Sequence, residues 1–190
     1  MIRVELDGQA IRALVGEVAD RLPLEGPQRL VVLAGGSLLA WHGLRESTRD
    51  VDSLRPLGTE LARVADEVGA AHGLAAGWLN ARAAAFIPLT LHFEDCAVLL
   101  DHPRLRVLGA PLDQVFLMKL YAARDRDLDD LRALWPIAGF GSAQHAAEQF
   151  WRAYPHAPDD PYLANFIADI AETTPPGRGP DDQQHHGPAR

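Results

Sequence analysis

The sequence predicts a mixed α/β fold, in which a small mixed sheet is flanked by helices and followed by a helical C-terminal portion. The apolar run VVLA at 31–34 is typical of a buried strand, and turn and helix signals follow it directly. Apolar residues at three- and four-residue spacing indicate amphipathic helices on both sides of that run. From Pro111 onward the patterns are helical, because Pro suits the first turn of a helix.

Composition limits the classes of protein to which this chain can belong. The 190 residues are 47% hydrophobic and 23% charged, which is typical of a globular protein with a real core. No apolar run approaches the length of a membrane span and no signal peptide is visible, so we expect a cytoplasmic protein without a membrane partner. The formal charge of −8 argues against nonspecific coating of nucleic acid, although it allows a local basic groove. The single Cys96 excludes an internal disulfide framework.

The first 110 residues are expected to form the sheet and its helices. Asp7 caps a first helix, Thr59 caps another that stops near Gly69 to Gly73, and the strands are expected around three stretches. These stretches are 31–34, the start of a strand at Asp50-Val51-Asp52, and two or three strands between Trp78 and Leu108. A tight turn, Gly35-Gly36-Ser37, and a short helix from Leu38 to Gly43 lie between the first two strands.

The remaining chain is expected to be helical up to a polar tail. An apolar helix follows Pro111, and the further helices are Asp127–Leu134, Ser142–Tyr154 and Pro161–Glu172. Residues 173–190 contain little that could be buried, so we expect disorder there. The predicted organisation is therefore a core at 1–110, a helical portion at 111–172 and a tail at 173–190.

Two short motifs carry the chemistry. A glycine-rich turn that opens a helix offers free backbone N–H groups to a phosphate, which suits Gly35-Gly36-Ser37. Side chains alternate along a strand, so Asp50 and Asp52 point to the same face. Paired carboxylates are hard oxygen ligands that suit Mg²⁺. Phosphoryl or nucleotidyl transfer needs both a phosphate cradle and a metal ion.

The apolar strand, Gly-Gly-Ser and Asp-x-Asp together resemble the nucleotidyltransferase superfamily, whose fold is that of DNA polymerase beta and the minimal nucleotidyltransferases. The fuller run GGSLLAWHGLRESTRDVDSL is similar to the abortive-infection toxin type found in bacterial type IV toxin–antitoxin systems, and to its relatives. Those proteins also have a helix with a Lys and a following Arg-Asp-x-x-Asp-Leu segment, which here reads LMKLYAARDRDLDDLRAL. The resemblance covers Val31 to Leu134.

The resemblance implies a role for each matching residue. Nucleotide phosphates would lie against the turn of Gly35, Gly36 and Ser37, and Asp50 and Asp52 would hold Mg²⁺ or Mn²⁺. Lys119 would contact the phosphates, and Asp127 would complete the acidic site, with Asp130 as the alternative. The superfamily commonly adds a third strand carboxylate, for which Glu94, Asp95 and Asp101 are the candidates.

Other readings of the charged residues stay open. Lys119 can equally be a surface side chain that extends from an apolar helix to water. Arg45, Arg49 and Arg55 flank the carboxylate pair and lower the cost of concentrating negative charge there. Arg45 is expected at the nucleotide, and the three arginines could also guide an acceptor or serve solubility alone.

We therefore expect a metal-dependent nucleotidyltransferase that moves a nucleoside monophosphate from a nucleoside triphosphate such as ATP to a hydroxyl of RNA (tRNA) or protein. By the same resemblance it would act as a toxin with a cognate antitoxin as partner. The alternative is a catalytically inactive nucleotide- or partner-binding module of the same fold. A third possibility is the antitoxin-like member of such a pair.

Overall fold

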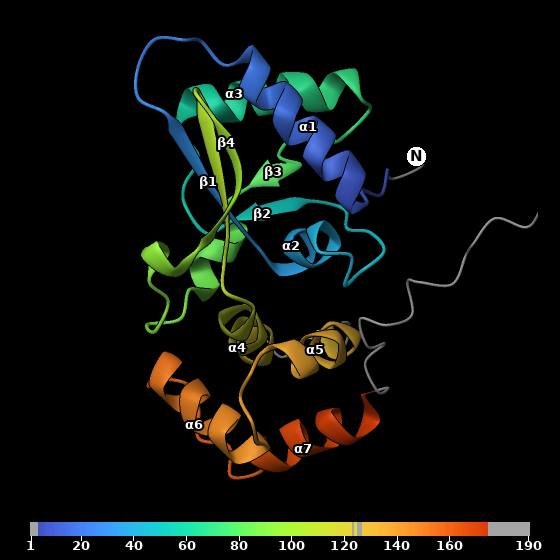
Figure 1. The fold of residues 1–190 in the computed structure, drawn as a ribbon, viewed down its shortest axis with the longest axis vertical. Coiled ribbons are helices and arrows are strands. Elements are labelled where there is room, and N and C mark those ends of the chain that lie inside the picture. Colours follow the sequence, from blue (N-terminus) through green and yellow to red (C-terminus); the bar gives the residue numbers. More distant parts are fainter. Residues whose placement is uncertain (1–3, 123, 125–126, 175–190) are drawn as a thin grey trace, which may run out of the picture.

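A five-stranded mixed sheet forms the centre of the N-terminal half (Figure 1). The computed structural model describes residues 4–122, 124 and 127–174. The strand order is β3-β2-β1-β5-β4, in which β1 runs parallel to β5 and antiparallel to β2. The strands are β1 (Arg29–Ala34), β2 (Val51–Ser53), β3 (Leu79–Asn80), β4 (Ala97–His102) and β5 (Leu105–Gly109). The expected α/β class is confirmed, and the two or three strands expected in the later stretch are three, β3, β4 and β5.

The middle strand fixes the position of the two sequence motifs. Residues 31–34 of β1 are completely buried, because β1 has a neighbouring strand on each side and apolar side chains on both faces. β1 pairs with β2 so that Ala34 lies opposite Asp52. The glycine turn begins directly after Ala34. The turn and the carboxylates therefore lie at one edge of the sheet, although they are separated along the chain.

Three helices accompany the sheet. They are α1 (Gly8–Arg21), α2 (Gly35–Trp41) and α3 (Thr59–Ala71), and α1 packs against both of the others (Figure 1). The helix expected from Leu38 to Gly43 begins at Gly35 and ends at Trp41, so the glycine turn is the first turn of α2. The Asp7 carboxylate caps α1, as expected, by accepting a hydrogen bond from the Ala10 N–H at 2.7 Å. The expected cap at Thr59 is wrong by one position, since Gly58 is the N-cap of α3 and Thr59 is its first helical residue. Two 3-10 helices, η1 (Arg82–Phe86) and η2 (Phe93–Asp95), follow β3.

The helical portion gathers beyond the edge of the sheet that carries the two motifs (Figure 1). It consists of α4 (Leu112–Ala122), α5 (Leu128–Leu134), the 3-10 helix η4 (Trp135–Ile137), α6 (Ala143–Ala153) and α7 (Leu163–Thr173). Six consecutive residues of α4, 115–120, are buried, so α4 forms the centre of this portion. Thr173, expected in the tail, is the last residue of α7. The rest of the predicted tail, from 175 onward, lies outside the described residues.

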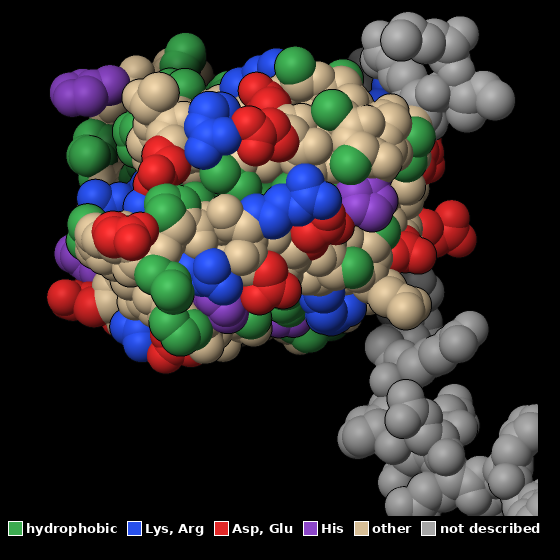
Figure 2. Space-filling view, turned by 90° about the horizontal axis from the view of Figure 1, so that it is seen from above, with side chains coloured by type: hydrophobic (Ala, Val, Ile, Leu, Met, Phe, Trp, Pro, Cys, Tyr) green, Lys and Arg blue, Asp and Glu red, His purple; other side chains and the backbone are tan. Residues whose placement is uncertain are grey.

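The end of the molecule farthest from the helical portion carries a mixed surface. Acidic and basic side chains alternate there with scattered apolar ones, and none of these kinds forms a large patch (Figure 2). Within the described ranges, no helix has the length and apolar character that a bilayer crossing requires. This face thus offers no concentrated feature that would suggest a binding site.

Candidate active site

A cleft of about 680 Å³ lies between the edge of the sheet and the helical portion. The sheet side contributes Gly35, Gly36, Arg45, residues 47–50 and Asp52, and η1 contributes Arg82, Ala83 and Phe86. The helical side contributes Val115, Met118, Lys119 and Ala122, followed by Arg124 and Asp127. Most of the predicted site residues thus line one cavity. They come from the two motifs and from the later Lys119 and Asp127. Its volume is in the range typical of small-molecule sites.

The glycine turn forms one wall of the cleft with its backbone. Gly35 has φ +58°, a conformation that residues with a Cβ rarely adopt. A Cβ on Gly36 would come within 3.1 Å of the Thr48 hydroxyl and 3.4 Å of an Arg45 guanidinium nitrogen. The conformation of Gly35 therefore favours glycine, and a side chain at Gly36 would have to displace Thr48 or Arg45 slightly. Arg45 is held in place by donating from Nε to the Ser47 carbonyl at 2.7 Å.

Ser37 lies outside the cleft. Its side chain is completely buried, and its hydroxyl donates to the Ala34 carbonyl at 2.9 Å. The same oxygen accepts a 3.3 Å hydrogen bond from the Asp52 N–H. The hydroxyl thus links the start of α2 to β2, and its role is to position the Asp52 backbone rather than to line the cavity.

Asp50 and Asp52 both face the cleft, as the strand period predicts. Arg82 lies 3.6 Å from Asp50, and it is well exposed. Burial, with the nearby charge of Asp50, raises the pKa of Asp52 to about 6, against the opposing effects of Arg82, Arg124 and a hydrogen bond from Asn80. The charge of each carboxylate disfavours the charge of the other, and carboxylate oxygens are the type of ligand that a hard divalent cation prefers. The pair therefore offers the right type of ligand for a magnesium ion, but only two such side chains.

Lys119 is buried between two carboxylates. Its Nζ lies 2.9 Å from Asp127 Oδ1 and 2.6 Å from Asp130 Oδ2, and all three side chains are no more than 8% exposed. Arg45 also contacts Asp130 Oδ2, at 2.8 Å. The surface interpretation of Lys119 is therefore wrong. Asp127 or, alternatively, Asp130 was expected to complete the acidic site. Both carboxylates contact Lys119, and of the two only Asp127 lines the cleft.

None of the three candidates for a third strand carboxylate lines the cleft. Glu94 and Asp95 belong to η2, and Asp101 lies on β4, where it binds Arg106 and accepts a hydrogen bond from Gln28. In the part of the chain that the structure describes, no three His, Cys, Asp or Glu side chains form a group that could hold a metal ion. Among the described residues, the other acidic side chains that line the cleft are Glu5 and Asp127, and Asp127 is paired with Lys119. Arg49 lines the cleft together with Arg45, whereas Arg55 stacks on Phe93 elsewhere.

The cleft residues that sequence reasoning missed include Arg82, Phe86 and Arg124. Arg82 and Phe86 belong to η1, and the guanidinium of Arg124 lies over the Phe86 ring at 5.4 Å. β3 runs parallel to β2, so the segment after β3 leaves the sheet at the edge where Asp52 lies. A correct assignment of the two-residue strand Leu79–Asn80 would have predicted the position of η1, but so short a strand leaves almost no pattern.

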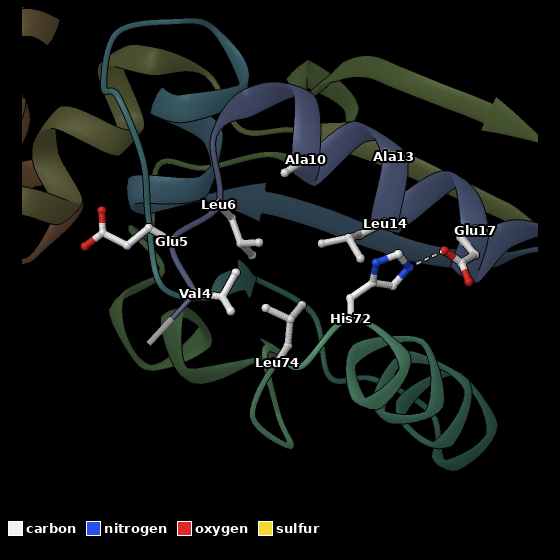
Figure 3. A pocket seen from close by; sticks show the side chains of 9 residues that line it. All are labelled: Val4, Glu5, Leu6, Ala10, Ala13, Leu14, Glu17, His72 and Leu74. Carbon is white, nitrogen blue, oxygen red and sulfur yellow. Dashed lines mark hydrogen bonds and ion pairs between the residues drawn. The ribbon is translucent and has the colours of Figure 1, made fainter. Parts of the chain in front are cut away.

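A second hollow, of about 210 Å³, lies between α1 and the residues after α3 (Figure 3). Its lining is mostly aliphatic, with Val4, Leu6, Leu14 and Leu74 pointing inward, and a hydrogen bond joins Glu17 to His72 at its rim (Figure 3). It brings together neither paired carboxylates nor a cluster of cations. The chemistry of the molecule is therefore concentrated in the larger cleft.

Comparison with known proteins supplies a family. A family model described as "Nucleotidyltransferase of unknown function (DUF6036)" matches residues 2–135. This match spans the sheet, its helices and both α4 and α5, and so includes every cleft residue described above. No curated protein and no solved structure matches the chain.

Proposed function

The chain belongs to this family of nucleotidyltransferases of unknown function, and from that premise we propose that the cleft transfers a nucleoside monophosphate from a nucleoside triphosphate to a hydroxyl group. The observation that carries the proposal is the meeting of the glycine turn, Asp50 and Asp52 in one cavity with arginines at its rim. A cavity with a backbone phosphate wall next to paired carboxylates matches the requirements of this reaction.

The proposed step is a displacement at the α-phosphorus. The acceptor oxygen forms a bond to the α-phosphorus. At the same time the bond between the α-phosphorus and the oxygen that bridges to the β-phosphate breaks, and pyrophosphate leaves. The hydroxyl proton passes to water in the open cleft. Asp50 and Asp52 would hold Mg²⁺ or Mn²⁺, which supplies neutralisation of the charge that builds up on the phosphate oxygens. Gly35, Gly36 and Arg45 orient the phosphates beside the carboxylates, and Asp127 fixes Lys119 at the opposite wall.

An acidic protein with basic residues at its cleft suits a polyanionic acceptor. The formal charge of the whole chain is −8, yet Arg49, Arg82 and Arg124 all line this cavity. Together with the resemblance to abortive-infection toxins, this supports RNA such as tRNA as the acceptor, ahead of a protein hydroxyl. It also supports a role as the toxin of a toxin–antitoxin pair, in which the cognate antitoxin is a further partner.

The test is label transfer. The protein is incubated with each α-labelled nucleoside triphosphate, a divalent cation, and either total RNA or protein extract. We expect label in the RNA and release of pyrophosphate, both lost in Asp50→Ala. Growth arrest on expression, relieved by the same substitution, would support the toxin role. Nucleotide binding without any transfer to RNA or protein would instead favour an inactive binding module, which the two-carboxylate acidic site of the described residues already makes a serious alternative.

A further inference from the structure

The lining of the cleft has two chemically different parts. The polar part includes the glycine turn, the carboxylates and the guanidinium of Arg45. The apolar wall consists of Ala83 and Phe86 from η1 and of Val115, Met118 and Ala122 from α4. Apolar side chains do not stabilise phosphates or metal ions. This wall is therefore suited to an uncharged part of the ligand.

Phe86 is the aromatic residue of this wall, and the helical portion holds it firmly. The Phe86 carbonyl accepts a hydrogen bond from the Tyr154 hydroxyl at 2.6 Å. The edge of its ring meets Tyr121, with centroids 6.3 Å apart, and Tyr121 in turn stacks on Tyr154 at 4.0 Å. Because these contacts order the ring before any ligand arrives, a group that stacks on it loses little entropy to side-chain ordering.

One short element, η1, also joins the polar and apolar parts of the lining. η1 begins at Arg82, beside Asp50, and ends at Phe86. Its five residues advance by about 8 Å at the usual 3-10 rise, a separation that a ribose and its base can bridge. A nucleotide whose α-phosphate lies at the carboxylates thus has its base near the apolar wall.

We propose that the nucleobase stacks on the Phe86 ring, with the guanidinium of Arg124 closing over its other face. This inference rests on the proposed function and specifies how the same cleft binds its nucleotide. Arg124 lies over the ring at 5.4 Å and is exposed, so it can move outward to admit the base. Aromatic rings and guanidinium planes both stack on bases, because every base presents a π-face.

The test measures the contribution of the base to binding separately from that of the phosphates. Calorimetry measures the binding of Mg²⁺ with either an ATP analogue that has a methylene α–β bridge or inorganic tripolyphosphate, which lacks a base. For Phe86→Ala we expect about tenfold weaker binding of the analogue and unchanged binding of tripolyphosphate. Arg124→Gln should weaken the analogue by a smaller factor. Phe93→Ala is the matched control, since Phe93 also lies 5.4 Å beneath an arginine, Arg55, but outside the cleft.

The outcomes distinguish this inference from the function on which it rests. If folded Phe86→Ala binds the analogue as tightly as the unaltered chain, or loses both ligands equally, base stacking on Phe86 is wrong. If the unaltered chain binds neither ligand, the nucleotide site itself is wrong. Circular dichroism checks folding, and Phe86→Leu, which keeps the apolar bulk without the π-face, replaces Phe86→Ala if that variant does not fold.

Discussion

Two pairs of aspartates lie at or next to the cleft, and their negative charges are compensated to different extents. Asp127 and Asp130 are almost completely buried, and each contacts Lys119, while Asp130 also binds Arg45. Asp50 is 38% exposed, and its ion-pair partner among the described residues is the exposed Arg82. Asp52 makes no ion pair with any described residue, and its pKa is raised to about 6. The first pair is neutralised within the fold, whereas the second is left with excess negative charge.

The difference shows which carboxylates can do chemistry. A buried charge that has lost its partner costs several kcal/mol, so Asp127 and Asp130 are committed to Lys119 and Arg45. Two carboxylates whose negative charge is not compensated within the fold are instead stabilised when a cation binds. We therefore assign stability to the helical pair and ligand binding to the strand pair, and the following substitutions test that division.

The largest effect is expected for the strand pair on activity. Asp52→Asn should lower nucleotide transfer by at least about a thousandfold, because it removes a charge that acts on the reacting phosphates. The melting temperature should not fall, and Mg²⁺ should raise it for the unaltered chain but not for this variant. Asp101→Asn is the control, since Asp101 lies on β4 away from the cleft. Equal losses in the two variants would contradict the assignment.

The helical pair should reverse this pattern. Lys119→Ala leaves two buried carboxylates with only Arg45 as a partner, and the free energy of unfolding should fall by about 3–5 kcal/mol. Urea denaturation measures it. A variant that combines Lys119→Met with Asp127→Asn and Asp130→Asn removes the charges together and should recover much of the loss. If Lys119→Ala alone leaves stability unchanged, the ion cluster does not hold the helical portion in place.

The raised pKa of Asp52 predicts a pH-dependent cost to the unliganded fold. Between its ordinary value of 3.8 and about 6, the folded chain keeps a proton that the unfolded chain releases, so the unaltered protein loses stability as pH rises through this window. The side chain of Asn does not titrate, so Asp52→Asn should not lose stability in this way. Above pH 6 its free energy of unfolding should exceed that of the unaltered chain by about 2 kcal/mol. The advantage should vanish near pH 4. Denaturation at several pH values without metal measures it, and an advantage independent of pH would contradict the prediction.

The smallest effect concerns the arginine nearest the strand pair. Arg82→Ala removes a positive charge that lowers the pKa of Asp52, so that pKa should rise further. Arg82 is 73% exposed, and water screens its charge, so we expect less than about one unit. Carboxyl NMR titration measures the shift. Arg63→Ala on α3, which removes an exposed pair with Glu67, should leave the titration of Asp52 unchanged.

The sequence predicted the parts of the site that are local in the chain. Strand period alone brought Asp50 and Asp52 to one face, and the glycines followed from the turn between strand and helix. Ser37 was also predicted for the cleft, but its hydroxyl is used to join α2 to β2. A polar side chain can bind a ligand or hold two elements of the fold together. Which of these it does depends on its neighbours in space, and a sequence motif does not show those neighbours.

The long-range parts of the site could not be predicted in this way. Lys119 is the one basic residue of the apolar helix α4, and its burial depends on Asp127 and Asp130, which follow in the chain and pack against it. Arg82 and Phe86 depend on the two-residue strand β3, and Arg124 on its stacking with Phe86. These residues meet through tertiary packing, for which no short motif exists.

The ion pair between Arg45 and Asp130 joins residues that are 85 positions apart. A gene fragment that ended at residue 110 would encode the whole sheet, yet Arg45 would lose its carboxylate and the cleft would lose its second wall. The family match, by contrast, continues to residue 135 and keeps both. A chain without α5 would therefore lack both the carboxylate that binds Arg45 and the cleft wall that holds Lys119.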